Sequence, residues 1–575
     1  MTYIHNDPKD FFDEMLVGFA AAYPDRIATV PGGVIRATAV PMGQVAVIIG
    51  GGSGHYPAFA GLVGPGLAHA AAMGNIFASP SAHAVYSVAK SANKGAGVLL
   101  TYGNYAGDCI NFDEAQQRLI DEGIPCRTVT VTDDISSAPG NEWQKRRGIA
   151  GDLCVFKAAA WAAEQGRPLD AVYEMCALAN SMTRSFGIAF SGCTLPGASA
   201  PLFTVPKGRM GVGMGIHGET GLHEDDIISA SGIAEMLVRE LLEQAPADRG
   251  TDRVAVLTNG LGSISHEELF VLHGYVDMLL RASGLTPVDP DVGELCTSLD
   301  MAGVSLTLCW LQGDLEQAWL APADTPAYRK GAIAPRSLSA PALIETEELT
   351  HTEPADPGSQ AAARVGLRAI QAAAARINLT VDELGALDAI AGDGDHGIGM
   401  ARGVNGAAAA AVDLAAHHAG LGALLIGSGD AWSDRAGGTS GALWGLMLTT
   451  MGSAIGDAHA PDALGVAHAV DQARRAVIDV GKAEIGDKTM VDALTPFADS
   501  LLAGVSGGAT LADAWAEAAA TAEAAASATA QLLPKKGRAR PHAEQAVGTP
   551  DPGAVSLASI VSAISEVLKQ EVGND

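Results

Sequence analysis

The stretch VAVIIGGGSGHYP (Val45–Pro57) joins an apolar run to a series of glycines. The run has the β-branched composition and the length of a buried strand. Glycines placed directly after a strand let the backbone turn sharply and approach a ligand closely. The dinucleotide-binding pattern G-x-G-x-x-G is not formed, because His55 stands where it would continue. By itself such a loop is as typical of a tight structural turn as of a binding site.

Similar apolar runs recur through the first part of the chain and alternate with helical segments such as Ile233–Gln244. This alternation is typical of α/β architecture, and it predicts two α/β lobes. The further predicted strands are GVLLTYG (Gly97–Gly103), TVTVTDD (Thr128–Asp134) and VAVLTNG (Val254–Gly260).

The character of the sequence changes after a segment rich in Pro, Thr and Glu, Gly331–Gln360. Beyond it, strand signals almost vanish and the segments become long, alanine-rich and amphipathic. Alanine is the strongest helix former, and small side chains allow close helix packing. We therefore expect an α/β domain over residues 1–335, a linker over 336–360 and an all-helical domain over 361–575.

Composition narrows the classes of function. The formal net charge of −29 disfavours binding to nucleic acid or to anionic lipid, and it requires that any phosphate be bound locally by amides, cations or metal ions. No uninterrupted apolar run reaches the ~18 residues of a membrane span, and the acidic first residues do not resemble a signal peptide. The seven cysteines form no C-x-x-C pair, which favours reduced thiols in the cytoplasm.

Three polar residues of the first domain form a candidate acid, base and nucleophile set. His55 lies in the glycine loop, Asp108 follows the strand that ends at GNYAGD, and His217 is flanked by glycines in GMGIHGETG. A histidine with so little cover is expected to line a cavity, although a lone histidine is more often a satisfied core residue. Together the three could provide nucleophilic and proton-transfer chemistry.

Three carboxylates follow the linker in LDAIAGDGDHGIGM. Asp388, Asp393 and Asp395 are spaced for a helix end followed by a glycine loop, not for one helix face. Carboxylates gathered at one point repel unless a hard divalent cation neutralises them, which favours Mg²⁺. The alternatives are a solvated acidic turn or a calcium loop, but the twelve-residue calcium pattern is absent.

Other segments of the helical domain are suited to phosphate binding. AGGTSGALWG (Ala436–Gly445) is a glycine turn that leads into a helix, where the amides and hydroxyls of Thr439 and Ser440 could bind phosphate. GKAEIGDKTMVDAL (Gly481–Leu494) lacks the order of a P-loop. GRARPHAEQ provides Arg538, and DPGA begins at Asp551. Each segment alone is more often structural.

With these motifs in order, the chain resembles the single-chain, ATP-dependent dihydroxyacetone kinases over nearly its whole length. The matching motifs are GGGSGH, NYAGD, SGCTLPG, GIHGETG, TSLDMAG, GDGDHG, GGTSGALWG, GDKTMVDAL, GRA and DPGA. The resemblance implies a ketose-binding domain fused to an eight-helix barrel that binds ATP, and a homodimer.

The resemblance also implies residue roles. His217 would add through a ring nitrogen to the substrate carbonyl as a covalent hemiaminal, with His55 and Asp108 handling protons. Asp388, Asp393 and Asp395 would hold two Mg²⁺ ions. Gly52, Ser53, Tyr56 and Gly103 would lie at the ketose. The nucleotide site would be formed by His396, Gly397, Ile398, Gly399, Thr439, Ser440, Gly481, Met490, Arg538, Asp551, Pro552 and Gly553.

Two departures from the family pattern bear on the substrate. Dihydroxyacetone enzymes resemble G-S-G-H-E-P and K-N-Y-x-G-D, whereas this chain has Tyr56 after His55 and Gly103 before Asn104. The chain is thus more similar to the erythrulose kinases of the family, and we expect D-erythrulose, phosphorylated at C4, as the substrate, with L-erythrulose next.

Three alternatives remain from the sequence. One is an ordinary dihydroxyacetone kinase. Another is a lyase that cyclises FAD at the same metal site. The third is a non-catalytic regulator or phosphocarrier subunit, against which the fusion of both domains and the intact His217 argue.

Overall fold

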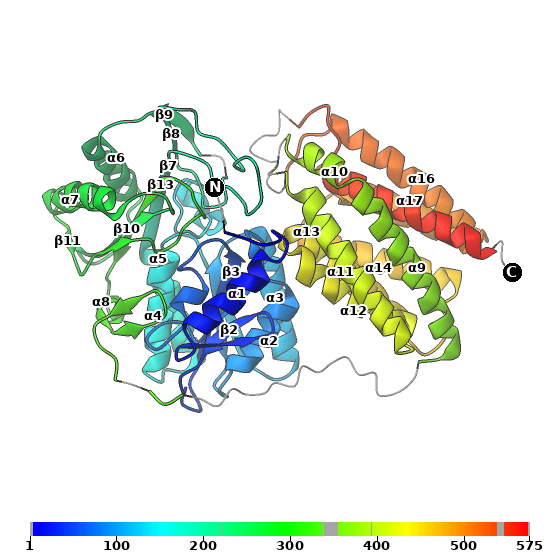
Figure 1. The fold of residues 1–575 in the computed structure, drawn as a ribbon, viewed down its shortest axis with the longest axis horizontal. Coiled ribbons are helices and arrows are strands. Elements are labelled where there is room, and N and C mark those ends of the chain that lie inside the picture. Colours follow the sequence, from blue (N-terminus) through cyan, green and yellow to red (C-terminus); the bar gives the residue numbers. More distant parts are fainter. Residues whose placement is uncertain are drawn as a thin grey trace. The chain divides into compact units, whose positions relative to one another are not determined.

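The computed structural model describes residues 4–219, 221–334, 336–338, 355–390, 392, 394–536 and 546–572. The chain divides into two compact units, Met1–Ile344 and Glu345–Asp575 (Figure 1). Each unit has its own apolar core, one α/β and one helical. The predicted fold class, an α/β domain followed by an all-helical domain, is confirmed.

The first sheet of unit 1 has six strands in the order β1-β2-β4-β3-β5-β6. The strands β3 to β6 pair in parallel, and the hairpin β1-β2 adds antiparallel strands at one edge. Their bounds are β1 Ile27–Val30, β2 Gly33–Arg36, β3 Ala46–Ser53, β4 Ala70–Ile76, β5 Val98–Gly103 and β6 Cys126–Val131. The strands predicted at Val45, Gly97 and Thr128 are β3, β5 and β6, displaced by one to three residues.

The strand order reverses at the point where polar residues were expected. From β3 the chain crosses to β4 on one side of β3, while β5 lies on its other side. Ligands of parallel α/β sheets bind outside the carboxyl ends of the strands at such a reversal. The glycine loop leaves β3 at this edge, and the NYAGD segment leaves β5 beside it.

The second sheet has the order β11-β10-β13-β7-β8-β9, with β12 pairing to β10. Here β10, β13, β7, β8 and β9 pair antiparallel. The bounds are β7 Thr183–Ala189, β8 Arg209–Val212, β9 His223–Asp226, β10 Arg253–Gly260, β11 Thr286–Pro287, β12 Asp291–Gly293 and β13 Gly303–Trp310. A short hairpin, β14 Ala323–Asp324 with β15 Arg329–Lys330, follows.

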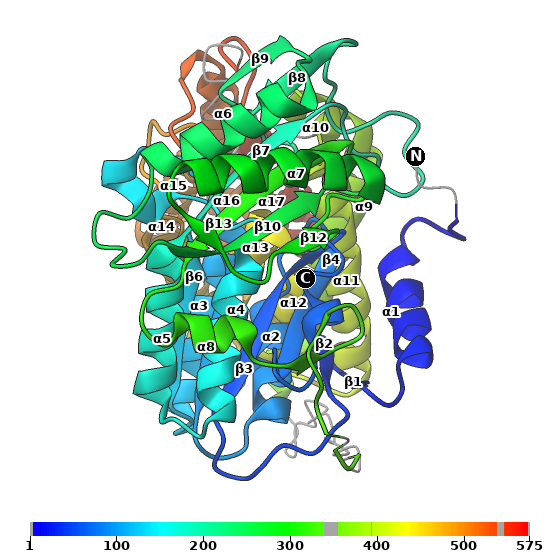
Figure 2. The same cartoon turned by 90° about the vertical axis from the view of Figure 1, so that its left-hand side faces the viewer.

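Helices cover both sheets of unit 1. Helices α2 and α3 pack on the first sheet, α6 and α7 pack on the second (Figure 2), and α4 and α5 contact strands of both. Two sheets with their own helices confirm the predicted two lobes. The bounds are α1 Phe11–Ala22, α2 Ala82–Ala92, α3 Ala106–Asp121, α4 Asp152–Glu164, α5 Leu169–Met182, α6 Ala230–Glu243, α7 His266–Ala282 and α8 Leu315–Leu320.

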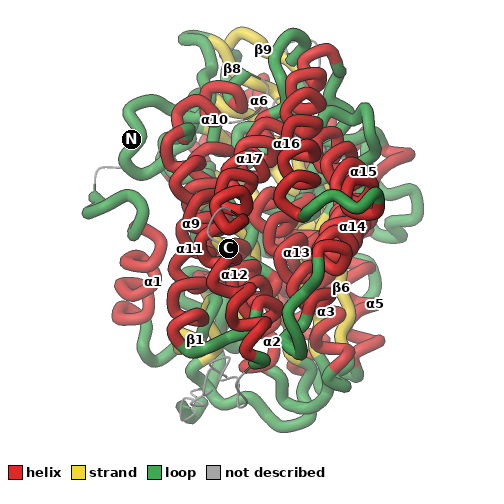
Figure 3. Tube along the Cα trace, turned by 90° about the vertical axis from the view of Figure 1, so that its right-hand side faces the viewer, coloured by secondary structure: helices red, strands yellow, loops and turns green. Residues whose placement is uncertain are grey.

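Unit 2 is helical throughout its described residues (Figure 3). Eight helices form a closed ring in which each contacts the next, in the order α9-α11-α12-α13-α14-α15-α16-α17 and back to α9. The short α10 precedes α11. The expected eight-helix barrel is therefore present. The bounds are α9 Pro357–Leu379, α10 Val381–Asp388, α11 His396–Ala416, α12 Leu421–Ala436, α13 Gly438–Ile455, α14 Ala463–Gly481, α15 Val491–Ser506, α16 Leu511–Ala528 and α17 Pro552–Val572.

Two features of unit 2 differ from what the sequence predicted or need comment beside it. Helix α9 begins at Pro357, inside the range expected as linker, because the Asp356 side chain caps it by accepting from the amides of Gly358 and Ser359. Among the described helices, α17 is long and apolar enough to cross a membrane by length and composition, but it packs against α16 and α9 within the ring.

Candidate functional site

The glycine loop after β3 is held by close backbone approach. A Cβ atom on Gly52 would lie 2.7 Å from the backbone nitrogen of Ala78, so only glycine fits there without a shift. The next residue, Ser53, is buried and donates its hydroxyl to the Gly74 carbonyl at 2.7 Å. The two predicted substrate-binding residues thus anchor the loop to β4 and the segment after it.

His55 lies at the end of this loop, buried to 1% exposure. Its Nδ1 atom is 2.7 Å from the Thr297 carbonyl oxygen, and its ring stacks on Phe77 with centroids 4.9 Å apart. Burial, with a contribution from the charge of His217, lowers the pKa of His55 to about 3. His55 is therefore neutral near pH 7.

His217 reaches the same point from the loop between β8 and β9. Its Nε2 atom lies 2.9 Å from Nε2 of His55. Its Nδ1 atom lies 3.1 Å from a carboxylate oxygen of Glu219, and its backbone amide donates to the other oxygen at 2.9 Å. The side chain is 12% exposed. The structure thus brings together two of the three residues predicted as the chemical centre of unit 1.

Aromatic rings enclose the histidine pair. The ring of Tyr105 meets the ring of His217 edge to face at a centroid distance of 4.6 Å, and the Tyr105 hydroxyl donates to the Gly148 carbonyl. Tyr105 precedes α3, and Asp108 lies buried in the first turn of that helix. Asp108 thus lies at the N-terminal end of a helix, three residues after the tyrosine that packs on His217.

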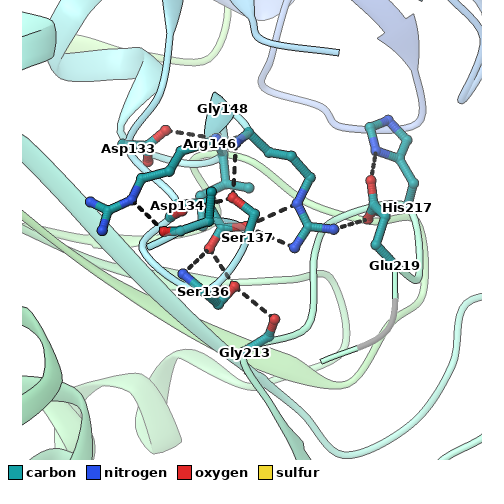
Figure 4. A network of polar contacts seen from close by, with 12 residues as sticks. Asp133, Asp134, Ser136, Ser137, Arg146, Gly148, Gly213, His217 and Glu219 are labelled. Atoms are coloured by element: carbon teal, nitrogen blue, oxygen red, sulfur yellow. Dashed lines mark hydrogen bonds and ion pairs between the residues drawn. The ribbon is translucent and has the colours of Figure 1, made fainter. Parts of the chain in front are cut away.

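A chain of ion pairs extends from His217 into the protein (Figure 4). Arg147 approaches Glu219 at 3.8 Å and pairs with Asp134 at 2.9 Å, while Asp134 accepts from the amide of Ser136 at 3.0 Å. Burial alone would raise the pKa of Glu219, but Arg147 and His217 outweigh burial and hold that pKa well below its ordinary value.

The two positions that depart from the dihydroxyacetone pattern differ in environment. Tyr56 is 46% exposed and its ring meets Phe19 of α1. Tyr56 and the glycine loop also line a hollow of about 40 Å³ beneath α1. Gly103 is tightly packed, since a Cβ atom there would lie 3.1 Å from the ring of Tyr105 and 3.2 Å from the Gly148 carbonyl oxygen.

In unit 2, two of the three predicted metal ligands lie at the junction of α10 and α11. Asp388 is the last residue of α10, and Asp395 is the N-cap residue of α11. Burial, together with the neighbouring Asp388 carboxylate, raises the pKa of Asp395 to about 6. Oxygen donors that repel one another fit a hard divalent cation such as Mg²⁺. The described residues alone supply no group of three candidate ligands, and Asp393 lies outside them.

The N-terminal ends of α11, α15 and α17 meet near these carboxylates. His396, the first residue of α11, lies 3.0 Å through Nε2 from the Ser556 hydroxyl of α17. A Cβ atom on Gly553 would lie 3.5 Å from Cβ of Met490, which caps α15. Burial raises the pKa of Asp551 to about 7, with added repulsion from Asp492 and Asp388.

The remaining predicted nucleotide residues that the structure describes lie at helix ends. The positive φ angles of Gly437 and Gly438 form the turn before α13, which places Thr439 and Ser440 in its first turn. Gly481, the last residue of α14, approaches Leu443 of α13. In α11, Gly397 packs against α10 and Ile398 is exposed beside Gly399; Pro552 begins α17. Arg538 lies outside the described residues.

Sequence reasoning assigned no role to Glu219, Thr297, Arg147, Tyr105 or Phe77, although Glu219, Thr297 and Tyr105 lie in motifs that it quoted. A carboxylate two residues after a glycine-flanked histidine was the available signal for Glu219. The sequence contained no comparable signal for Thr297 or Arg147, because each reaches the histidines only through the packing of distant segments.

Two protein-family models match the chain: the Dak1 domain over residues 17–327 and the DAK2 domain over residues 390–566. The chain is 55% identical over 574 residues to the L-erythrulose kinase of Pectobacterium atrosepticum, covering 99% of this chain and 97% of that protein. It is 50% identical to the D-erythrulose kinase of Mycolicibacterium smegmatis, covering 98% of each.

Among solved structures, the dihydroxyacetone kinase of C. freundii in complex with AMP-PNP and Mg²⁺ is similar to this chain. The identity is 30%, the TM-score is 0.52, and the match covers 98% of this chain and 99% of the other. Both units therefore have counterparts of known sequence and structure.

Proposed function

This chain is an ATP-dependent kinase of the dihydroxyacetone kinase family, and we propose that it phosphorylates erythrulose held as a hemiaminal on His217. The observation that carries the proposal is the histidine pair of unit 1: Nε2 of His217 lies 2.9 Å from Nε2 of His55, while Nδ1 of His217 lies 3.1 Å from Glu219. A ring nitrogen so placed can add to a carbonyl carbon, which glycerol lacks.

The substrate proposal rests on two supports. Tyr56 and Gly103 stand where the dihydroxyacetone pattern has a charged pair, and relatives at 55% and 50% identity are named for erythrulose. Those relatives are named for opposite enantiomers, so the D-erythrulose predicted from the sequence stays a prediction that the assay below tests directly.

Phosphoryl transfer requires positioning and neutralisation of charge more than covalent participation by the protein. We assign Asp108 as the base that takes the proton from the attacking hydroxyl of the ketose. It lies in the first turn of α3, three residues after Tyr105, whose ring packs on His217. The ketose would be held by Gly52 and Ser53 through the loop that they anchor.

In unit 2 we assign Asp388, Asp393 and Asp395 as ligands of two Mg²⁺ ions, which would neutralise the phosphates of ATP. The nucleotide would lie across the helix ends that carry His396, Thr439 and Ser440, whose amides suit phosphate. The remaining residues assigned to this site are Gly397, Ile398, Gly399, Gly481, Met490, Arg538, Asp551, Pro552 and Gly553.

Three further assignments belong to the proposal. The domains span 1–335 and 361–575 with a linker between them, and the enzyme acts as a homodimer. It works in the cytoplasm, where ATP is available and where the seven free cysteines would stay reduced.

The test is an ADP-release assay with ATP and Mg²⁺ that compares D-erythrulose, L-erythrulose, dihydroxyacetone and glycerol. We expect turnover with at least one erythrulose enantiomer to exceed turnover with dihydroxyacetone, and glycerol to be inactive. Equal turnover with dihydroxyacetone would remove the argument from Tyr56 and Gly103, and turnover with glycerol would contradict the hemiaminal.

A further inference from the structure

The hydrogen-bond partners of His55 determine which of its nitrogens carries a proton. A carbonyl oxygen can only accept, so the 2.7 Å contact with Thr297 requires a proton on Nδ1 of His55. Because burial keeps the ring neutral, its Nε2 atom has no proton of its own and acts as an acceptor. That bare nitrogen is the atom that faces His217.

The partners of His217 require a second fixed proton. Glu219 accepts the backbone amide of His217 through one oxygen and faces Nδ1 through the other. Since Arg147 and His217 keep Glu219 ionised, the carboxylate can only accept, and Nδ1 of His217 must carry a proton. A hydrogen bond between the Nε2 atoms of the two rings, which lie 2.9 Å apart, then requires one further proton between them.

The pair of rings therefore carries three protons and one positive charge. Glu219 is the anion in contact with that charge (Figure 4). Arg147 approaches Glu219 and is in turn paired with Asp134. Each charge in the chain from His217 to Asp134 thus has a neighbour of opposite sign, which is the condition for keeping charges in a poorly hydrated site.

We propose that Glu219, held by Arg147, is a positioning residue that keeps the ring proton of His217 on Nδ1, so that Nε2 is the nitrogen that bonds to the ketose. This inference rests on the proposed hemiaminal and explains which nitrogen forms it. Arg147 acts one step further away, by keeping Glu219 ionised and oriented.

Formation of the bond between His217 and the ketose requires no further reactant. The shared proton moves fully onto Nε2 of His55, and the lone pair of His217 Nε2 forms the bond to the carbonyl carbon. The π electrons of the carbonyl pass to its oxygen, which takes the proton from His55 and becomes a hydroxyl. His55 returns to its neutral form. The substituted ring of His217 keeps its Nδ1 proton and the single positive charge, still opposite Glu219.

The test compares the full-length wild type with Glu219→Gln, Glu219→Asp and Arg147→Lys, all labelled with ¹⁵N-histidine. Signals of His217 are assigned by their loss in His217→Gln. In the ligand-free wild type we expect Nδ1 of His217 to be protonated. Glutamine can donate its amide to Nδ1, so Glu219→Gln should remove the proton from Nδ1 and leave His217 protonated on Nε2 alone, whereas Glu219→Asp and Arg147→Lys, which preserve the charges, should retain the wild-type pattern in large part.

Ketose binding is then measured with D- and L-erythrulose carrying ¹³C at the carbonyl. We expect Glu219→Gln to weaken ketose affinity about 10- to 100-fold, the range for loss of a hydrogen bond to a charged group, while AMP-PNP binding stays unchanged. Glu224→Gln, on the exposed face of β9, is the matched control and should behave as wild type.

The outcomes separate this inference from the proposed function. An unchanged nitrogen pattern in Glu219→Gln, with or without a loss of affinity, overturns the positioning role. A bound ketose whose labelled carbon stays a ketone in the wild type overturns the proposed hemiaminal instead, and the nitrogen pattern of the ligand-free protein is read independently of that result.

Discussion

The Nε2 atoms of His55 and His217 lie 2.9 Å apart, although 162 residues separate the two histidines in the chain. His55 arrives on a loop of the first sheet and His217 on a loop of the second, so the contact joins the two lobes of unit 1. Any change that displaces one lobe against the other should alter this contact and, with it, the ketose site.

Replacement of His217 by alanine should remove the nucleophile that distinguishes a ketose from a polyol. We expect turnover with the preferred erythrulose to fall at least about 100-fold, a loss typical of a residue that takes part directly in the chemistry. Binding of AMP-PNP, measured by calorimetry, should persist because unit 2 has its own core. His223→Ala, an exposed histidine on β9, is the control, and unchanged ketose affinity in His217→Ala would rule out the hemiaminal.

Replacement of Asp388 by asparagine should weaken metal binding in unit 2. We expect a drop in turnover of about 100-fold or more, because metal neutralisation of developing charge contributes several kcal/mol. Higher Mg²⁺ concentrations should restore part of the rate. Asp413→Asn, an exposed carboxylate on α11 beside His417, should leave the rate and its Mg²⁺ dependence unchanged. A normal rate in Asp388→Asn would contradict the metal assignment.

Tyr56→Glu should shift the preference from erythrulose toward dihydroxyacetone. Tyr56 is half exposed and its ring meets Phe19 of α1 edge to face, so the change should be tolerated by the fold. We expect the ratio of kcat/KM values for the two ketoses to change about tenfold, which is the usual size of the effect when a pocket gains or loses a contact with one small substrate group. Tyr275→Glu, at an exposed tyrosine of α7, serves as the surface control. An unchanged ratio of kcat/KM values would show that Tyr56 does not determine the substrate preference.

Gly103→Lys should be more damaging than Tyr56→Glu. Any side chain at this position must displace the ring of Tyr105 or the Gly148 carbonyl by a few tenths of an ångström, and Tyr105 packs on His217. We expect kcat/KM to fall for every ketose, with nucleotide affinity retained. If Gly103→Lys instead gains activity with dihydroxyacetone alone, the glycine is a specificity residue and not a packing requirement.

The buried state of His55 predicts a pH dependence of stability. Its pKa is about 3 in the folded protein and about 6.5 in an unfolded chain. The unfolded state therefore binds more protons below pH 6.5, so this contribution to stability is fully present above pH 6.5 and is lost as the pH falls toward 3. From pH 7 to pH 5 the wild type should lose about 2 kcal/mol more unfolding free energy than His55→Gln. Urea unfolding at both values measures this, and parallel losses would argue against a neutral buried His55.

Much of the architecture could be predicted from the sequence because it follows from the conformational preferences of short segments. The β-branched runs at β3, β5, β6 and β10 and the alanine-rich helices of unit 2 carry strong intrinsic preferences. The glycines beside His55 and before Thr439 signalled backbone conformations that other residues avoid. These signals sufficed for the two fold classes and for most candidate residues.

Tertiary structure alone decided which atoms meet. Glu219 could be seen near His217 in the sequence, but its ionised state depends on Arg147, which is brought there by the segment after β6. The tautomer of His55 depends on the Thr297 carbonyl, 242 residues away. Sequence spacing determines which residues share a loop, whereas protonation depends on burial and on charges within a few ångströms, and these exist only once distant segments have packed together.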